Sequence, residues 1–397
     1  MMGTQLSLKG IVMFLDRLLT SNPALAELAF EWHRQGIIEP DTYVLDLDAI
    51  AQNARAMQNE ASECGITLYY MLKQIGRNPL IAQAVEGAGF RGAVCVDWRE
   101  ALVMARAGMH LGNVGHLVQT PVSVLPEIVA AKPDIMTVYS IEKARQIGEA
   151  AAKLELQQPI MLRVLGPNDT LYSGQYGGFR IEELRPVIEE LEKIPGVRIA
   201  GVCSFPCFLF SEETGDLEAL ANIETVRAAA SLLEERGYHD LQLNMPSASC
   251  VHTIPLVAAR GGTHMEPGHS LTGTTPYHVM HVEPERVGYV YVSELSHNLD
   301  GGGFCYAGGH YRRGHVEHAL MGRSIEQSAR VGVVPPDDAC IDYHFALSEP
   351  GQVGDTVLMC FRAQLFVTRS EVAVVSGLFA GAPKLEGIFN TQGTRLR

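Results

Sequence analysis

Lys73 is the residue whose type and position most directly predict chemistry. It follows an apolar run, Ile66 to Leu72, whose length and β-branched or aromatic content are typical of a buried parallel strand, and a turn comes directly after it. Loss of hydration at the end of such a strand favours the neutral amine, which can attack a carbonyl and form a Schiff base. The alternative is a solvated lysine that begins a loop.

A second candidate is the stretch HMEPGHSLTGTTP. Glu266 ends a predicted strand, and the Pro-Gly turn after it would let the backbone N–H groups of Gly268, His269 and Ser270 face one anion. Such a loop can bind a phosphate without a basic side chain. The alternatives are a strand-end turn that binds nothing and a Glu266 side chain that faces solvent.

The elements that must position these residues alternate along the chain. Amphipathic helical patterns such as WREALVMARAG and IEELRPVIEELEKI separate eight short apolar runs. The runs are Thr67 to Leu72, Gly92 to Val96, Val114 to Val118, Ile135 to Tyr139, Ile160 to Leu165, Ile199 to Ser204, Leu241 to Met245 and Thr263 to Glu266. This pattern predicts a (β/α)8 TIM barrel, with a doubly wound open sheet as the alternative. Such barrels place their chemistry at the carboxyl ends of strands, where Lys73, Ser204 and Glu266 fall.

The regions on either side of the barrel lack its alternation of apolar runs and amphipathic helices. Residues 1–42 have helical spacing, broken at Asn22-Pro23, and are predicted to pack on the rest of the chain. Residues 43–275 would form the barrel. Residues 276–397 contain strand-like runs such as VGYVYVSELS and EVAVVSGLF without amphipathic helices, and are predicted to form a mostly β domain.

Composition narrows the class of protein. The chain has 397 residues and a net charge of -14, and no basic stripe interrupts the acidity, so no nucleic-acid or membrane partner is expected. The eight cysteines form no CxxC pair and no secretory signal precedes them, which predicts reduced thiols and a cytoplasmic protein.

Taken together, these motifs resemble the fold-type III pyridoxal-phosphate enzymes, the alanine racemase and basic amino-acid decarboxylase superfamily. Lys73 matches the Schiff-base lysine, and DLDAIAQNARAM and CVDWREALVMARAG are similar to racemase segments. EPGHSL is similar to the decarboxylases' EPGR loop. The resemblance covers roughly residues 43 to 275 and implies pyridoxal 5'-phosphate as the cofactor.

The resemblance implies further cofactor-binding residues. Arg77 stands where racemases have a tyrosine that binds the phosphate, and Phe205 stands where their histidine stacks on the pyridine ring. Ser247 and Ser249 resemble the racemases' serine segment beside the phosphate, although either could instead cap a helix. Arg163 is equally an active-site cation or a structural arginine of the barrel. Ser204, Gly268, His269 and Ser270 complete the predicted set.

The β domain contains a segment, GFCYAGGHYRR, that is similar to the racemase segment carrying a catalytic tyrosine across a dimer interface. Tyr306 takes that tyrosine's place. Racemisation needs bases on both faces of the substrate carbon, and Lys73 and Tyr306 would fill these roles in a homodimer with a shared site. The alternative is a hairpin with a packed tyrosine. Asp342 and Tyr343 roughly match a second cross-subunit segment.

Two departures from the racemases keep other reactions open. YSGQYGGF lacks their arginine, and Glu266 replaces the arginine beside the pyridine nitrogen. An amino-acid racemase is predicted, with a pyridoxal-phosphate aldolase, dehydratase or decarboxylase, or a non-catalytic pyridoxal-phosphate-binding protein, as alternatives. No metal site is predicted, although some related aldolases and dehydratases use a metal and this β domain is rich in histidines (His297, His310, His315, His318, His344). The substrate amino acid is not predicted.

Overall fold

The protein falls into two compact units. A computed structural model describes residues 13–337 and 339–397; residues 1–12, the start of the predicted helical segment, lie outside this range. The barrel unit comprises Ile50–Leu271, Gln364–Val367 and Phe389–Arg397. The β unit comprises the described residues up to Ala49, together with Thr272–Ala363 and Thr368–Ile388.

Eight parallel strands close into a barrel within the described residues, in the order β5-β4-β3-β2-β12-β11-β8-β6, and β6 pairs with β5. They are β2 (Thr67–Tyr70), β3 (Gly92–Cys95), β4 (Leu111–Val114), β5 (Ile135–Val138), β6 (Gln158–Leu165), β8 (Val197–Cys203), β11 (Gln242–Asn244) and β12 (His264–Met265). The predicted (β/α)8 barrel is confirmed. An open doubly wound sheet is excluded because the edge strands β5 and β6 pair with each other.

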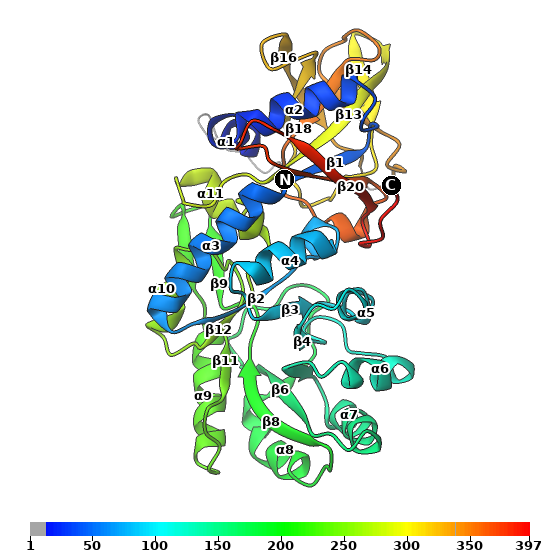
Figure 1. The fold of residues 1–397 in the computed structure, drawn as a ribbon. Coiled ribbons are helices and arrows are strands. Elements are labelled where there is room, and N and C mark those ends of the chain that lie inside the picture. Colours follow the sequence, from blue (N-terminus) through cyan, green and yellow to red (C-terminus); the bar gives the residue numbers. More distant parts are fainter. Residues whose placement is uncertain (1–12, 338) are drawn as a thin grey trace. The chain divides into compact units, whose positions relative to one another are not determined.

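Helices precede or connect the barrel strands and lie outside them (Figure 1). They are α3 (Leu47–Cys64), α4 (Pro79–Gly87), α5 (Trp98–Arg106), α6 (Leu125–Ala130), α7 (Ile141–Lys153), α8 (Leu184–Leu191), α9 (Asn222–Glu234) and α10 (Thr253–Ala258). Capping side chains start several of them: Asp97 accepts from Glu100 N, and Ser140 accepts from Lys143 N. Three short strands accompany the barrel, namely β7 (Phe179–Arg180) beside β6 and the hairpin of β9 (Phe208–Ser211) with β10 (Asp216–Ala219).

One strand is predicted at the wrong residues. The sequence places a strand at Val114–Val118, whereas β4 spans Leu111–Val114 and the following residues form a loop. Gly112 and Asn113 interrupt the apolar pattern that strand prediction depends on. Both have tertiary reasons: a Cβ at residue 112 would lie 2.3 Å from the Tyr69 ring, and the Asn113 side chain hydrogen-bonds within the barrel.

The β unit is built on a mainly antiparallel sheet in the order β14-β17-β16-β15-β18-β13-β1-β19-β20. The strands are β1 (Thr42–Asp46), β13 (Tyr289–Leu299), β14 (Gly302–Tyr306), β15 (His318–Gly322), β16 (Ser328–Val334), β17 (His344–Leu347), β18 (Thr356–Met359), β19 (Glu371–Ser376) and β20 (Lys384–Asn390). The predicted mostly β C-terminal domain is confirmed. Its short helix α11 is Pro276–Met280.

Two N-terminal helices cover part of this sheet. They are α1 (Phe14–Ser21) and α2 (Pro23–Arg34), and the predicted break at Asn22-Pro23 is confirmed. Their apolar faces form one buried cluster with strand residues such as Val44, Val292 and Ala373. No helix among the described residues is both long and apolar enough to span a bilayer.

Two tail segments belong to the barrel unit although the sequence analysis places them in the β domain. They are Gln364–Val367 and Phe389–Arg397. Conversely, residues 43–49 fall in the β unit, where β1 pairs with β13 and β19. The boundaries at residues 42 and 275 stay predictions about domain organisation.

Candidate active site

Lys73 lies directly beyond the first barrel strand, in the 3-10 helix η1 (Lys73–Ile75), and its side chain is half-buried. Its ammonium is close enough to Glu100 and His116 to influence the pKa of each. The strand before it is fully buried at Tyr69 and Tyr70. The structure therefore places the predicted cofactor lysine at the carboxyl end of the barrel.

The glycine loop is joined to the lysine turn. Met71 N donates to Pro267 O (2.9 Å), and a Cβ at Gly268 would lie 2.4 Å from Gln74 Nε2. A larger residue at position 268 would have to displace the end of the Gln74 side chain. The lysine turn and the glycine loop, the two segments predicted to carry the chemistry, therefore lie side by side.

Glu266 points into the barrel. Its Oε1 accepts hydrogen bonds from Asn113 Nδ2 (3.0 Å) and Asn244 Nδ2 (2.5 Å), and Thr137 Oγ1 donates to Asn113 Oδ1 (2.8 Å). Glu266 is only 5% exposed, so the alternative in which it faces solvent is excluded. Its Oε2 has no hydrogen-bond partner within the described parts of the chain.

His116 is a site residue that the sequence analysis missed. It is fully buried after β4, and its Nε2 lies 3.4 Å from Glu266 Oε2. Burial lowers the pKa of His116, and the charges of Arg163 and Lys73 act in the same direction while Glu266 opposes them. The sequence pattern assigns this residue to a strand. Correct bounds for β4 would have placed it just beyond the end of the strand.

Phe205 lies against His116, with ring centroids 5.4 Å apart in an edge-to-face arrangement. Its other ring neighbour is Tyr172, at 5.3 Å, from the loop after β6. The preceding residue, Ser204, donates to Asp169 Oδ2 (3.1 Å) and accepts from Asn222 Nδ2 (2.9 Å). Ser204 thus holds that loop in place, and the aromatic face at Phe205 is the part of this segment that is suited to a planar ring.

Arg163 is buried and connects three loops. Its Nη1 donates to Tyr139 Oη (3.0 Å) and its Nη2 to Gln175 O (2.8 Å), while Tyr139 Oη donates to His116 O (2.5 Å). The Nε of Arg163 has no hydrogen-bond partner among the residues described. The structural role is therefore present, and a cationic role in the site would use Nε.

Arg77 is also buried, and an acidic side chain already neutralises it. Its Nη2 lies 2.6 Å from Asp97 Oδ2, its Nη1 donates to Gln392 Oε1 (2.7 Å), and the Phe366 ring lies 5.1 Å away. Two of these partners come from the tail segments. If Arg77 binds the phosphate, it would do so through Nε, which has no hydrogen-bond partner in the described structure.

The serines near the glycine loop differ in their hydrogen bonds. Ser270 Oγ donates to Ser249 O (2.5 Å), and Ser247 Oγ donates to Phe208 O (2.8 Å). The hydroxyl of Ser249 is buried and has no hydrogen-bond partner in the part of the chain described. The helix-cap alternative does not hold for Ser247 or Ser249, because α10 begins at Thr253 with His252 as its N-cap.

His269 follows Gly268 and begins the 3-10 helix η4 (His269–Thr272). Its Nε2 lies 3.2 Å from the amide nitrogen of Gln364, another tail residue. The tail segments therefore support both the lysine turn and the glycine loop.

Tyr306 belongs to the β unit, at the end of β14. Its side chain is 39% exposed and lies 5.9 Å from the His344 ring, measured between centroids. His344 in turn contacts His297 (5.1 Å). Tyr343 is exposed, and the Asp342 carbonyl accepts from Arg369. Among the described residues, no three His, Cys, Asp or Glu side chains have metal-binding geometry.

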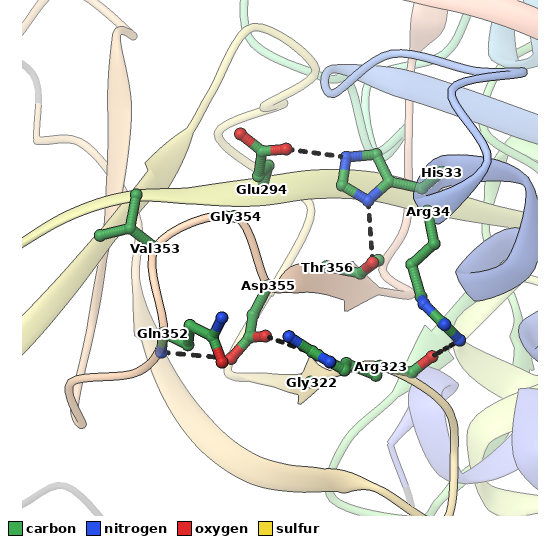
Figure 2. A pocket seen from close by; sticks show the side chains of 10 residues that line it. All are labelled: His33, Arg34, Glu294, Gly322, Arg323, Gln352, Val353, Gly354, Asp355 and Thr356. Carbon is green, nitrogen blue, oxygen red and sulfur yellow. Dashed lines mark hydrogen bonds and ion pairs between the residues drawn. The ribbon is translucent and has the colours of Figure 1, made fainter.

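A polar pocket of about 240 Å³ lies within the β unit (Figure 2). His33 contacts Thr356 Oγ1 (2.8 Å) through Nδ1 and Glu294 Oε2 (3.4 Å) through Nε2. Arg34 donates to Arg323 O (3.2 Å). Because these groups bind one another, the barrel, with buried polar atoms that lack such partners, is the better candidate for a ligand site.

The barrel site fits pyridoxal 5'-phosphate. Lys73 could bind the aldehyde of the cofactor, and Glu266 Oε2 could bind its ring nitrogen. Phe205 could contact one edge or face of the ring. Ser249 Oγ and the Gly268 loop offer donors for the phosphate. Unpaired buried polar atoms are costly unless a ligand or water binds them. Their presence on residues at or just beyond the carboxyl ends of barrel strands therefore supports a polar ligand there.

A closed parallel barrel with a lysine after its first strand, a glycine loop after its last and a following β domain defines the class of fold-type III pyridoxal-phosphate enzymes. The chain belongs to the alanine racemase-like family of this class. The family described as alanine racemase, N-terminal domain, matches residues 45–276, and the one described as YhfX-like, C-terminal domain, matches residues 290–385. The resemblance inferred from the sequence is confirmed, and the family is pyridoxal-phosphate-dependent.

A relative in Escherichia coli (strain K12), "Uncharacterized protein YhfX", is 40% identical over 385 residues, which cover 97% of this chain and 100% of that protein. Solved structures with 16% identity share the fold. D-threonine aldolase from Filomicrobium marinum has a TM-score of 0.65 (90% of this chain, 95% of that chain). Alanine racemase of Clostridium difficile 630 with cycloserine (88%, 98%) and D-threo-3-hydroxyaspartate dehydratase from Delftia sp. HT23 (88%, 97%) each have a TM-score of 0.64.

Proposed function

We propose that this protein is a homodimeric pyridoxal-phosphate enzyme that acts at the α-carbon of an amino acid, and we favour racemisation. The observation that carries the proposal is the buried carboxylate of Glu266, whose Oε2 lacks a hydrogen-bond partner among the described residues inside a barrel with Lys73 at its mouth. Free thiols at all eight cysteines suit the cytoplasm, where we place the protein.

Each residue of the site would have its own chemical role. Pyridoxal phosphate supplies a ring that withdraws electrons from the α-carbon of a bound amino acid. Glu266, an opposite charge beside the ring nitrogen, favours the protonated ring. Asn113 and Asn244 fix the carboxylate through Oε1, so that Oε2 is the oxygen presented to the nitrogen.

Racemisation needs one base on each face of the α-carbon. The Lys73 amine would remove or return the proton on one face, and the Tyr306 hydroxyl on the other. Tyr306 is partly exposed in the β unit, which suits a residue that a second subunit supplies. This assignment draws on the racemases that the chain resembles.

Aldolase, dehydratase or decarboxylase chemistry is the second candidate. Glu266 favours it, because a protonated ring stabilises the negative charge that any of these reactions creates. Two solved structures of similar fold are named as an aldolase and a dehydratase. A non-catalytic binding protein would hold the cofactor but exchange no α-proton.

Borohydride trapping tests the cofactor assignment. The wild-type protein should be yellow, and reduction followed by peptide mapping should place the cofactor on Lys73. Lys73→Ala should lose all trapping while remaining folded, with Lys143→Ala as a control that traps normally. Trapping at another lysine would refute the site.

A solvent-deuterium exchange screen of D- and L-amino acids then separates the reactions. A racemase should exchange the α-proton and give both enantiomers on chiral analysis. Release of an aldehyde, loss of water from the substrate, or release of carbon dioxide would identify the second candidate. Stable cofactor with no exchange over the whole panel would identify a non-catalytic binding protein.

A further inference from the structure

The two oxygens of Glu266 have different surroundings. Oε1 accepts two amide hydrogen bonds, whereas Oε2 has none from the described residues. Nε2 of His116 lies 3.4 Å from Oε2. Since a good N–H···O bond is about 2.9 Å long, His116 contacts this oxygen without saturating it. Oε2 therefore keeps capacity for a second donor.

The His116 ring is fixed in place. Its main-chain carbonyl accepts from Tyr139 Oη (2.5 Å), Tyr139 is bound to Arg163, and the ring packs edge-on against Phe205. Neither ring nitrogen has a hydrogen-bond partner within the described chain. A fully buried imidazole whose two nitrogens both lack a hydrogen-bond partner is costly, which favours a functional role for the ring beyond packing.

Burial favours the neutral form of His116. Burial lowers its pKa, the cations Arg163 and Lys73 lower it further, and Glu266 opposes them. A neutral imidazole carries one N–H. With the proton on Nε2, the donor is on the nitrogen that lies 3.4 Å from the carboxylate oxygen; with the proton on Nδ1, two acceptor atoms would lie 3.4 Å apart.

Resting on the proposed function, we propose that His116 is a positioning residue for Glu266: its Nε2–H directs Oε2 and keeps that oxygen anionic for the protonated nitrogen of a pyridine ligand. His116 does not touch the reacting carbon. The predicted result of losing it is weaker recognition of the ring nitrogen, not loss of the Lys73 chemistry.

Paired ligands measure this recognition directly. Pyridoxal phosphate and its 1-deaza analogue, in which CH replaces the ring nitrogen, are titrated into cofactor-free, full-length protein, and the ratio of their Kd values is taken. The wild type should prefer pyridoxal phosphate about tenfold or more, as a charge-assisted hydrogen bond predicts. Glu266→Gln should bring the ratio near one.

Two variants of equal length separate hydrogen bonding from packing. His116→Gln keeps an amide N–H near the position of Nε2, whereas His116→Met has a similar shape without a donor. The methionine variant should lower the ratio about three- to tenfold, and the glutamine variant should restore most of it. A wild-type ratio in His116→Met would overturn the inference and leave the proposed function intact.

The tautomer gives a second measurement on unaltered protein. In cofactor-free wild type labelled with 15N-histidine, the His116 signal, assigned through its contact with Phe205, should show the Nε2–H form. An Nδ1–H form would overturn the inference even if the variants fail to fold. Failure of the wild type to bind either ligand would refute the proposed function and this inference together.

Discussion

Glu266 is the residue that most clearly separates this site from that of a racemase with an arginine partner. Its carboxylate is buried, and Asn113 and Asn244 hold one of its oxygens. An arginine at this position would repel a protonated ring nitrogen, whereas a carboxylate stabilises it. In the proposed site, the identity of residue 266 would therefore set how much negative charge the ring can accept.

Substitution of Glu266 should lower the rate of α-proton exchange and, with arginine, also narrow the range of substrates. Glu266→Gln removes the charge and should slow α-proton exchange by about 10²-fold. Glu266→Arg should lower exchange as well and narrow the set of amino acids that react. Exchange rates for a panel of substrates measure both effects, with Glu294→Gln, in the β unit, as a control. Wild-type behaviour of both variants would refute the electronic argument.

Local patterns made Lys73 and Glu266 predictable, because each ends an apolar run and precedes a turn. Tertiary packing hid others. The sequence pattern assigns His116 to a strand because Gly112 and Asn113, which pack inside the barrel, interrupt the apolar run of β4. The partner of Arg77 in the tail is 315 residues away, a contact that no local pattern encodes.

At the scale of elements, the turns after β2 and β3 are held together by the ion pair of Arg77 with Asp97. Asp97 has two tasks, since its Oδ2 binds Arg77 and its Oδ1 accepts from Glu100 N at the start of α5. The Gln392 and Phe366 contacts bring the tail to the same point. The lysine turn is thus supported by elements far apart in sequence.

Arg77→Met should destabilise the barrel unit by about 3 kcal/mol, because it leaves a largely buried carboxylate without its partner. Arg185→Met, which breaks the exposed pair with Glu235, should cost less than about 1 kcal/mol. Urea unfolding of both variants measures the difference. Equal small losses would show that the Arg77 pair does not support the turn.

In the β unit, His33 joins α2 to strands β13 and β18. Burial lowers its pKa, and Glu294 partly opposes this. Because the folded pKa lies below the unfolded value near 6.5, protons bind the unfolded chain preferentially. The stability that neutral His33 contributes is therefore complete above about pH 6.5 and is lost as the pH falls towards the folded pKa.

His33→Gln should remove this dependence. The difference in unfolding free energy between wild type and variant should shrink from pH 7.5 to pH 5, by about 1.4 kcal/mol for each unit by which the pKa is lowered. Thermal or urea unfolding across this range measures it, and the other histidines cancel in the comparison. A difference that does not change with pH would show that His33 does not titrate in this window.

At the scale of the whole molecule, the two proposed bases lie in different units. Lys73 belongs to the barrel unit, and Tyr306 belongs to the β unit with a partly exposed side chain. The resemblance to racemases implies that each site takes its tyrosine from the partner subunit. A two-fold symmetric dimer would then contain two sites, each built from both chains.

Mixed dimers test this arrangement. Lys73→Ala and Tyr306→Phe should each be nearly inactive in racemisation when expressed alone, and racemisation is the activity measured here. In a co-expressed mixed dimer, one site receives both substitutions and the other receives an intact Lys73 from one chain and an intact Tyr306 from the other. A statistical mixture should therefore recover about a quarter of wild-type activity, since half of the dimers carry one intact site. Purification of the mixed dimer through two different tags should raise this to about half. If Tyr306 served the site of its own chain, both sites of the mixed dimer would lack one base, and mixing would restore no activity.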